Sequence, residues 1–585
     1  MSVPDAPLIV QSDRTLLLEV AHPKADDCRR ELARFAELER SPEHIHTYRI
    51  TPLSLWNACA AGLGAHEVLQ VLERYSRFPV PAAISSEVRD QAGRYGRLRI
   101  ELVEGELMLT ATDPAVMEEV GRLGAVAALL GERPSPGRAR LRPLVRGRLK
   151  QALIKAGWPA EDVAGYTPGA PLVVELRSTT PDGQPSRLRD YQIAAAEAFW
   201  AAGGPHGGSG VLVLPCGAGK TMIGIGVMAR ARTRTLVLTT SVVAVRQWRE
   251  ELLRRTTLDA DTIGEYSGLH KMIRPVTIAT YQVLTHALPR RPGAAAGDPD
   301  DVGRFPHLAL LEQQDWGLVI YDEVHLLPAP VIRMTAEIQS KRRLGLTATL
   351  VREDHREDDV FSLVGPKRYA APWRELEAQG WIAPAVCCEV RVAFNPEQRM
   401  AYATAELADR YRIAASNPAK LALVDALCAR HRDDRVLVIG QYLDQLQLLA
   451  ERLQAPLLTG RTSAGARQRL YAAFRTGALR RLVVSKVANF AVDLPEANVA
   501  IQVSGTFGSR QEEAQRLGRL LRPKADGGQA HFYTLVTRET LDQEFSLHRQ
   551  LFLTEQGYRY QILDSAAITA PSPAAAPAPR RGARA

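Results

Sequence analysis

The chain has 585 residues, which is too long for one hydrophobic core, so we expect three or four domains. Hydrophobic residues make up 46% and charged residues 24%, as in ordinary globular proteins, and the absence of a membrane-length apolar run excludes a membrane-spanning class. The net charge of +9 favours a polyanionic partner, because Lys and Arg bind phosphates and release counterions, although a general enrichment in arginine gives the same charge.

Residues 1–130 are predicted to form a separate mixed α/β domain. Apolar runs flank a polar stretch at 11–14, and a second pair between 98 and 110 flanks Glu104-Gly105, so two hairpins are expected. Thr51-Pro52 and Asp113-Pro114 each place a capping side chain before a proline at the first helical position, which predicts two helix starts. This region shows no recognisable chemistry.

Residues 131–186 differ in composition from the preceding region. The first part combines Pro and Gly with seven basic residues: Arg133, Arg138, Arg140, Arg142, Arg146, Arg148 and Lys150. We expect a basic linker there, whose charges are either solvated, the more common case, or face DNA. A small helix-and-strand unit follows at about 145–178.

Short β-rich runs alternate with helical stretches from 187 to 385, and again from 421 to 565. The runs of the first series are 211–214, 236–239, 276–279, 318–321 and 344–346, and those of the second are 436–439, 482–485, 499–503 and 532–536. Such alternation predicts parallel sheets flanked by helices, so the expected fold class is α/β, with two tandem parallel-sheet lobes behind the N-terminal domain. Residues 386–420 are expected to connect the lobes, and the Ala- and Pro-rich tail at 566–585 to be disordered.

A phosphate-binding loop is predicted directly after the first of these strands. The run 211–214 leads into Gly217-Ala218-Gly219-Lys220-Thr221, and the inward N–H groups of a glycine loop at a helix start form a phosphate cradle. Lys220 is expected to neutralise the β- and γ-phosphates, and the Thr221 hydroxyl to bind Mg²⁺. The stricter motif has glycine where this chain has Leu214, so the loop is the shorter variant.

A carboxylate pair follows the run 318–321. Asp322 is expected to hold the Mg²⁺ shell, and Glu323 to polarise the attacking water. A surface acidic pair is the alternative, but the position after a buried strand and downstream of a phosphate loop argues against it.

Two arginines of the second lobe lie three residues apart, so Arg519 and Arg522 share one face of a helix. Together with Gln515, they are expected to reach the γ-phosphate bound to the first lobe, as an arginine finger does. Hydrolysis would then depend on lobe closure. An ordinary basic helix end is the alternative interpretation.

The cysteines indicate neither a metal site nor a redox centre. None of the six lies in a CxxC pair or near a histidine at zinc-ligand spacing, so we expect no zinc and reduced thiols. The adjacent Cys387 and Cys388 fit positions in an apolar strand. With no signal peptide at the N-terminus, a cytoplasmic protein is expected.

Four motifs occur in the order of a nucleic-acid motor: the phosphate loop, Asp322-Glu323-Val324-His325, Thr347-Ala348-Thr349 and the segment 515–522. They supply a phosphate cradle, carboxylates for metal and water, a coupling element, and arginines for the developing charge. They resemble the motifs of superfamily 2 helicases. A denser series within 187–562 resembles the XPB-type DNA repair helicases: 346–354, 364–367, 493–498, 508–510 and 513–519.

The resemblance implies RecA-like lobes, ATP and Mg²⁺ as cofactors, and 3′ to 5′ movement on single-stranded or forked DNA in the nucleoid. The segment 188–192 is similar to the adenine-reading element, with Arg189 at the site and Gln192 as the base contact. Arg352-Glu353-Asp354 resembles an element that helps to separate strands, and 394–416 resembles a small thumb, with interleaved Arg and Tyr suited to backbone contact and base stacking.

Further candidate DNA contacts follow strands of the two lobes, where short polar side chains suit sequence-independent phosphate binding. They are Ser241, Arg246, Thr280 and Tyr281 in the first lobe and Lys486 in the second. Residues 1–130 look like the N-terminal domain of bacterial family members. One departure is Glu512, where eukaryotic members carry a basic residue.

The leading hypothesis is therefore an ATP-dependent DNA helicase or translocase, with a nuclease or repair protein as a further partner. A duplex translocase that does not separate strands would carry the same motor motifs. An RNA helicase is a second alternative, which the Asp-Glu-Val-His box disfavours. A nucleotide-gated scaffold that binds DNA and recruits a nuclease is a third, although such a switch has no need of the full hydrolytic set.

Overall fold

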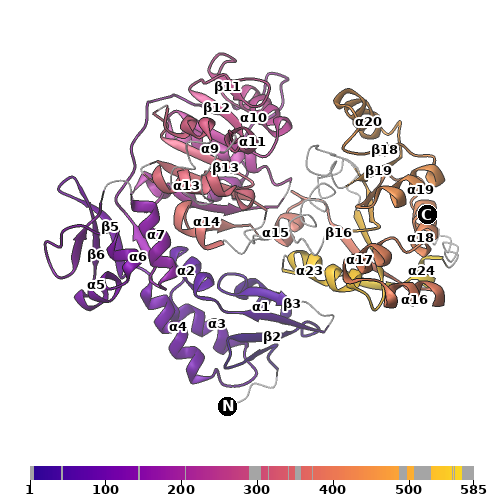
Figure 1. The fold of residues 1–585 in the computed structure, drawn as a ribbon, viewed down its shortest axis with the longest axis horizontal. Coiled ribbons are helices and arrows are strands. Elements are labelled where there is room, and N and C mark those ends of the chain that lie inside the picture. The colour runs from indigo at the N-terminus through magenta and orange to yellow at the C-terminus, as the bar shows by residue number, and fades with distance from the viewer. Residues whose placement is uncertain are drawn as a thin grey trace, which may run out of the picture.

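The computed structural model describes residues 5–40, 44–142, 145–204, 206–215, 217–288, 305–313, 315–339, 341–348, 357–371, 373–485, 497–505, 529–555, 558 and 560–569. In these ranges two four-stranded sheets precede two seven-stranded sheets along the chain. Figure 1 shows the two larger sheets in separate lobes, with the N-terminal part beside the first lobe and α23. No helix in the described part of the chain is long and apolar enough to cross a membrane.

The first sheet is antiparallel and belongs to the N-terminal region. Its strands, in order, are β1 (Leu8–Val10), β2 (Thr15–Glu19), β4 (Ile45–Arg49) and β3 (Glu37–Arg40). The helices here are α1 (Ala25–Leu32), α2 (Pro52–Ala60), α3 (Ala65–Tyr75) and α4 (Ala82–Arg94). The predicted first hairpin is confirmed, since Leu8 pairs with Leu18. The predicted helix start is confirmed too, because the Thr51 hydroxyl accepts a hydrogen bond from the Ser54 N–H ahead of α2.

The second sheet joins strands from both sides of residue 130, the expected domain boundary. Its order is β7 (Arg138–Arg140), β6 (Glu106–Ala111), β5 (Leu98–Val103) and β8 (Ala160–Asp162), with α5 (Pro114–Gly121), α6 (Gly124–Ala127) and α7 (Arg146–Lys155). The predicted turn is confirmed, with left-handed φ values of 51° at Glu104 and 86° at Gly105. The Asp113 side chain caps α5, as predicted.

Two basic residues of the expected linker are buried, so the expectation of solvated or DNA-facing charges is wrong for these two, whereas the other five are exposed. Arg146 and Lys150 lie on α7 and are only 7% and 5% exposed. Arg146 Nε and Lys150 Nζ each lie 3.0 Å from Oδ2 of Asp162 on β8. Gln151 Nε2 donates to Asp359 Oδ1 at 2.6 Å, so α7 also contacts the first lobe. The basic side chains therefore anchor this unit.

The first lobe is built on a parallel seven-stranded sheet. Its order is β11 (Ile263–Tyr266), β12 (Val276–Thr280), β10 (Thr235–Thr239), β13 (Leu318–Asp322), β14 (Arg342–Thr347), β9 (Ser209–Val213) and β15 (Lys367–Ala370). The helices are α8 (Asp190–Trp200), α9 (Lys220–Ala231), α10 (Val242–Arg255), α11 (Tyr281–Leu284), α12 (Leu310–Gln313), α13 (Ala329–Glu337), α14 (Glu357–Leu363) and α15 (Trp373–Ala378). All five predicted strand runs are confirmed.

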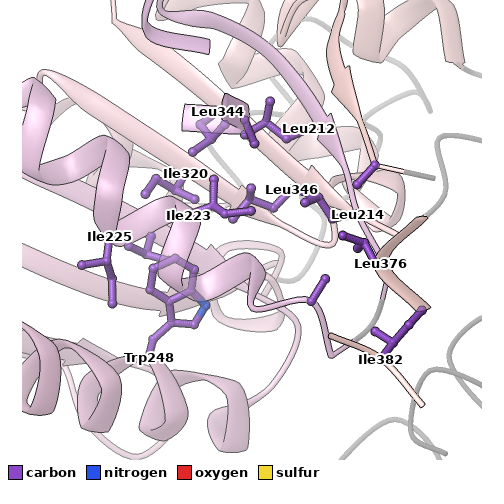
Figure 2. Packing of buried hydrophobic residues seen from close by; sticks show 14 of the residues in the cluster. Leu212, Leu214, Ile223, Ile225, Trp248, Ile320, Leu344, Leu346, Leu376 and Ile382 are labelled. Atoms are coloured by element: carbon purple, nitrogen blue, oxygen red, sulfur yellow. The ribbon is translucent and has the colours of Figure 1, made fainter. Parts of the chain in front are cut away.

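The core of this lobe holds α9 and α10 against the central strands. Leu212, Ile320, Leu344 and Leu346 project from the sheet toward Ile223 of α9, and the Trp248 ring of α10 lies beside Ile225 (Figure 2). Trp248 is 1% exposed. The helix that follows the phosphate loop is thereby fixed on the sheet by apolar packing.

The second lobe repeats the parallel arrangement. Its order is β18 (Leu457–Leu458), β19 (Arg481–Ser485), β17 (Val436–Gly440), β20 (Val499–Gln502), β21 (Ala530–Thr537), β16 (Ala385–Val392) and β22 (Tyr560–Asp564). The helices are α16 (Pro396–Thr404), α17 (Leu407–Ala415), α18 (Ala419–Arg430), α19 (Leu443–Leu453), α20 (Ala464–Thr476), α23 (Leu541–Glu555) and α24 (Ser565–Thr569). The four predicted runs are confirmed, and with them the α/β class with two tandem parallel-sheet lobes.

Three details differ from the sequence-based expectation or refine it. All of strand β16 but its first residue lies in the segment 386–420 expected as a connector, yet the strand pairs with β21 and β22 inside the sheet. Cys387 and Cys388 are on this strand, 1% and 3% exposed, which confirms their interpretation as buried strand positions. Residues 566–569 are not part of a disordered tail, because they continue α24, where Ile568 is 4% exposed.

Candidate functional site

The predicted motifs of the first lobe meet at one edge of its sheet. Strands β13, β14 and β9 are neighbours in a parallel sheet, so their carboxyl ends lie side by side. The phosphate loop follows β9, Asp322 ends β13, and Thr347 ends β14. A ligand site at the carboxyl edge of a parallel sheet is the general arrangement in α/β proteins.

The phosphate loop has the backbone conformation that its glycines permit. Gly217 and Gly219 have φ values of 86° and 74°, in the left-handed region. A Cβ atom on Gly219 would lie 2.6 Å from Nε2 of Gln192, so a side chain there would be strained as well as crowded. Helix α9 begins at Lys220, immediately after this glycine, and directs its first N–H groups toward the loop.

The predicted adenine-reading segment donates hydrogen bonds to the phosphate loop. The Gln192 side chain is 3% exposed; its Oε1 accepts from the Arg189 N–H at 2.9 Å and its Nε2 donates to Ala218 O at 3.1 Å. The Tyr191 hydroxyl donates to the same carbonyl at 2.7 Å. The role of Gln192 as the base contact stays a prediction.

Trp381, which the sequence analysis did not single out, lies next to this segment. The Arg189 guanidinium is 4.3 Å from the centroid of its ring, a cation–π contact. Trp381 precedes β16, the strand of the second lobe that comes first in the chain. The contact therefore links the nucleotide side of the first lobe to the junction between the lobes. A lone tryptophan in a loop gives no sequence signal of this.

Lys220 and Glu323 form an ion pair across the site. Lys220 Nζ lies 2.6 Å from Glu323 Oε1, and the side chains are 11% and 19% exposed. Glu323 has a φ of 53°, a left-handed conformation that is unfavourable for a residue other than glycine. Strain of this kind is concentrated at functional sites. The geometry places the predicted base directly beside the lysine that is predicted to bind phosphate.

Two aromatic side chains hold Asp322. Trp248 Nε1 donates to Asp322 Oδ2 at 2.9 Å, and the Tyr281 hydroxyl donates to the Asp322 backbone carbonyl at 3.1 Å. Burial raises the pKa of Asp322 to about 6 and the charge of Glu323 adds to this, whereas Lys220 and the Trp248 hydrogen bond lower it. Two carboxylates beside one lysine leave a net negative charge. Together with the Thr221 hydroxyl on α9, these hard oxygen ligands fit Mg²⁺.

His325 connects the carboxylate pair to β14. His325 Nδ1 and Thr347 Oγ1 are 2.7 Å apart, and the two residues are 3% and 0% exposed. The same nitrogen lies 3.6 Å from Glu323 Oε2. The end of β14, the expected coupling element, is therefore linked to Glu323 through one buried histidine.

The candidate DNA contacts of the first lobe fall into two groups. Arg246 is exposed on α10, and the partly exposed Ser241 caps that helix by accepting from the Ala244 N–H. Thr280 and Tyr281 are only 2% and 4% exposed, so direct DNA contact by their side chains is a wrong prediction. The Thr280 hydroxyl caps α11, and the Tyr281 hydroxyl binds Asp322.

Gln282 was missed by the sequence analysis. It is exposed beside the two buried residues and donates through Nε2 to Thr240 O at 2.6 Å. This hydrogen bond joins the segment that follows β10 to the segment that follows β12 at the protein surface. A polar residue at the start of a short helix gave no distinct signal.

Several predicted residues lie outside the described part of the chain: Arg352, Glu353, Asp354, Lys486, Gln515, Arg519 and Arg522. Their roles stay predictions.

The thumb-like segment forms α16 and α17. Its Tyr411 is 2% exposed and donates to Gly505 O, so this side chain is not a stacking platform. Arg399 and Arg410 are at least partly exposed there.

The chain has three features of one class of protein, the ATP-driven helicases with two RecA-like lobes. They are a glycine loop between a strand and a helix, an Asp-Glu pair at a strand end that faces the lysine of this loop, and a second parallel-sheet lobe. Family models agree. Residues 376–575 match the ERCC3/RAD25/XPB C-terminal helicase, residues 186–352 the type III restriction enzyme res subunit, and residues 8–135 a helicase conserved C-terminal domain.

Related proteins cover nearly the whole chain. It is 57% identical over 564 residues to the DNA 3′-5′ helicase XPB of Kineococcus radiotolerans, covering 96% of this chain and 97% of the relative. It is 55% identical over 569 residues to that of Mycobacterium tuberculosis, covering 97% and 100%. The general transcription and DNA repair factor IIH helicase/translocase subunit XPB of Antonospora locustae is 33% identical over 585 residues, covering 96% and 82%. The chain belongs to the XPB family of ATP-dependent helicases, which confirms the resemblance found in the sequence.

Proposed function

We propose that this protein is an ATP-dependent DNA helicase that moves 3′ to 5′, and that the site at the carboxyl edge of the first sheet hydrolyses the nucleotide. The observation that carries the proposal is the meeting of Lys220, which opens α9 after β9, with Asp322 and Glu323 at the end of β13, one strand away from β9 in the sheet; Lys220 lies 2.6 Å from Glu323. A phosphate-binding cation and a candidate base then act on the same phosphoryl group.

The residues of the first lobe have distinct proposed roles. The N–H groups of the glycine loop and Lys220 bind the phosphates, so Lys220 exchanges its carboxylate partner for phosphate oxygens. Glu323, released from Lys220, orients the attacking water and accepts its proton. Thr221 and Asp322 would hold Mg²⁺, which neutralises phosphate charge when bound. Gln192 and Arg189 border the adenine side.

The second lobe completes the site when the lobes close. We propose that Arg519 and Arg522 stabilise the charge that develops on the γ-phosphate, with Gln515 beside them. The sequence places all three between β20 and β21, strands at the interior of the second sheet. ATP hydrolysis would then require the closed arrangement and reopen it.

DNA is proposed to run along the ends of β10 and β12 and onto the second lobe. Ser241, Arg246 and Gln282 supply backbone contacts in the first lobe, and Lys486 supplies one in the second. Arg352, Glu353 and Asp354 are proposed to help separate the strands. A nuclease or repair protein is a proposed partner, because a strand-separating motor produces single strands on which such enzymes act.

The proposal is tested by ATP hydrolysis without nucleic acid and with single-stranded DNA, forked duplex and RNA, alongside Glu323→Gln as the control. We expect DNA to stimulate hydrolysis and the variant to abolish it. Indifference to every nucleic acid would refute the motor. A directional unwinding assay then separates the helicase from a duplex translocase, which would hydrolyse ATP without releasing a strand.

A further inference from the structure

Asp322 is held by hydrogen bonds from two different helices, and both donors are buried aromatic side chains. Trp248 binds the carboxylate at 2.9 Å and Tyr281 binds the backbone carbonyl at 3.1 Å. Their exposed fractions are 1% and 4%. Because both side chains are buried, each acts on the site through its neighbours, and Asp322 is the neighbour that they share.

Both aromatic residues belong to elements whose outer ends form the proposed DNA track. Trp248 lies on α10, the helix that Ser241 caps and that carries the exposed Arg246. Tyr281 is the first residue of α11, directly before the exposed Gln282. The Gln282–Thr240 hydrogen bond of 2.6 Å ties these two outer ends together.

Trp248 also contacts the helix that follows the phosphate loop. A Cβ atom on Gly224 of α9 would lie 2.5 Å from Cη2 of Trp248, so the indole ring is packed directly against this glycine. Figure 2 shows the ring beside Ile225, with its nitrogen turned away from that side chain. One side chain of α10 thus contacts both α9 and Asp322.

We propose that Trp248 and Tyr281 are positioning residues that transmit DNA binding on α10 and α11 to Asp322, and so set the DNA dependence of ATP hydrolysis. The inference rests on the proposed function. DNA backbone contact at Ser241, Arg246 and Gln282 shifts the starts of the two helices. Because close-packed interiors move as rigid units between discrete arrangements, the shift reaches the indole N–H and the phenol O–H, and with them the Asp322 carboxylate.

The test uses Trp248→Phe and Tyr281→Phe, which keep an aromatic ring and remove the donor. Two matched controls remove equivalent buried donors elsewhere in the lobe. Trp316 Nε1 donates to Leu310 O at 2.9 Å, and the Tyr321 hydroxyl pairs with Thr335 Oγ1 at 2.9 Å. The controls are Trp316→Phe and Tyr321→Phe. ATPase kcat, KM for ATP and Kd for forked DNA are measured for all five proteins.

We expect the Trp248 and Tyr281 variants to lose about tenfold in DNA-stimulated kcat, the effect of one hydrogen bond to a charged or polar site group. The KM for ATP and the Kd for DNA should stay within about twofold of the parent, because both side chains are buried and contact neither the nucleotide nor the DNA. The two controls should keep the parent's stimulation. If Trp248 and Tyr281 had a purely structural role, all four variants would lose thermal stability, and the test variants would not show a lower kcat at an unchanged Kd.

Parent-like stimulation in both test variants would overturn the proposal, as would an equal loss in the controls. A matching loss of DNA affinity would also overturn it, because the residues would then shape the track rather than transmit its occupation. If Trp248→Phe fails to fold, Tyr281→Phe decides alone, since it removes a single hydroxyl. Failure of the proposed function is recognised separately: the parent itself would then show no DNA stimulation.

Discussion

Lys220 Nζ lies 2.6 Å from Oε1 of Glu323, so the proposed phosphate-binding cation and the proposed base neutralise each other in the structure. The pair is largely buried, and Glu323 has a left-handed backbone conformation. In the proposed mechanism, binding of a triphosphate replaces this partner of Lys220 and frees the carboxylate for water. Hydrolysis would then depend on the bound nucleotide.

The first prediction concerns the lysine. Lys220→Ala is expected to lower ATPase kcat by about 100-fold or more, because a preorganised charge next to the transferring phosphoryl group is lost. DNA affinity should be nearly unchanged, since the DNA track is a separate surface. The matched control is Arg230→Ala on the same helix, whose side chain pairs with Glu197 at 2.6 Å. Near-normal hydrolysis in Lys220→Ala would refute the site.

The second prediction separates nucleotide binding from hydrolysis. Glu323→Gln should abolish turnover, because an amide does not accept the proton of water, yet it should bind ATP at least as tightly as the parent. The reason is that Lys220 no longer has a carboxylate partner to release. Equilibrium titration with a fluorescent ATP analogue measures this. A weaker affinity than the parent's would contradict the competition between Glu323 and phosphate.

The third prediction concerns the link between hydrolysis and movement. Thr347→Val removes the hydroxyl that lies 2.7 Å from His325 Nδ1 and keeps the volume of the side chain. We expect unwinding to fall about tenfold, the loss of one buried hydrogen bond, while most of the ATPase remains. Thr335→Val, another buried threonine of the lobe, serves as the control. Parallel loss of both activities would place Thr347 in the chemical step instead.

The fourth prediction tests strand separation. Arg352→Ala should retain DNA-stimulated ATPase and impair unwinding of a forked duplex, because the guanidinium is expected to hold a backbone phosphate at the point of separation. The two rates are compared on the same fork. An equal fall in both would argue against a dedicated role in separating strands.

Much of this architecture could be predicted because parallel-sheet proteins show their strands as buried apolar runs and their sites as the loops that follow. The phosphate loop after β9 and the pair after β13 were found in this way. Strand β15 was not, because its sequence Lys-Arg-Tyr-Ala is partly exposed at the sheet edge and has no apolar run. Strand β11 was not predicted either, because it is only four residues long.

The contacts that were missed join positions far apart in the sequence, which no local pattern encodes. Trp248 reaches Asp322 across 74 positions of sequence, and Tyr281 across 41. Tyr281 was predicted to contact DNA because it follows a strand, but burial directs its hydroxyl inward instead. Arg146 and Lys150 looked like a solvated charge run because their partner, Asp162, lies in a separate short strand.

The fifth prediction follows from that buried cluster. Asp162 lies between Arg146 and Lys150, and its side chain is 10% exposed. Although burial alone would raise the pKa of Asp162, the two cations lower it well below its ordinary value of 3.8. The carboxylate therefore contributes its full stabilisation above about pH 4 and loses it only as the pH falls through the lower folded-state pKa.

Asp162→Asn leaves two buried cations without their counter-charge, and should destabilise this part of the protein by about 3 kcal/mol or more. Burial lowers the pKa of Lys150 to about 7, although Asp162 opposes this shift. The apparent Tm, measured by calorimetry, should therefore fall more at pH 6, where the lysine is charged, than at pH 8, where it is largely neutral. Glu118→Gln, which breaks an exposed pair with Arg122, is the control and should leave Tm nearly unchanged. Adding Lys150→Met to Asp162→Asn should restore part of the loss, since one unpaired buried charge is then removed. A Tm for Asp162→Asn equal to the parent's would show that the cluster is not what anchors α7.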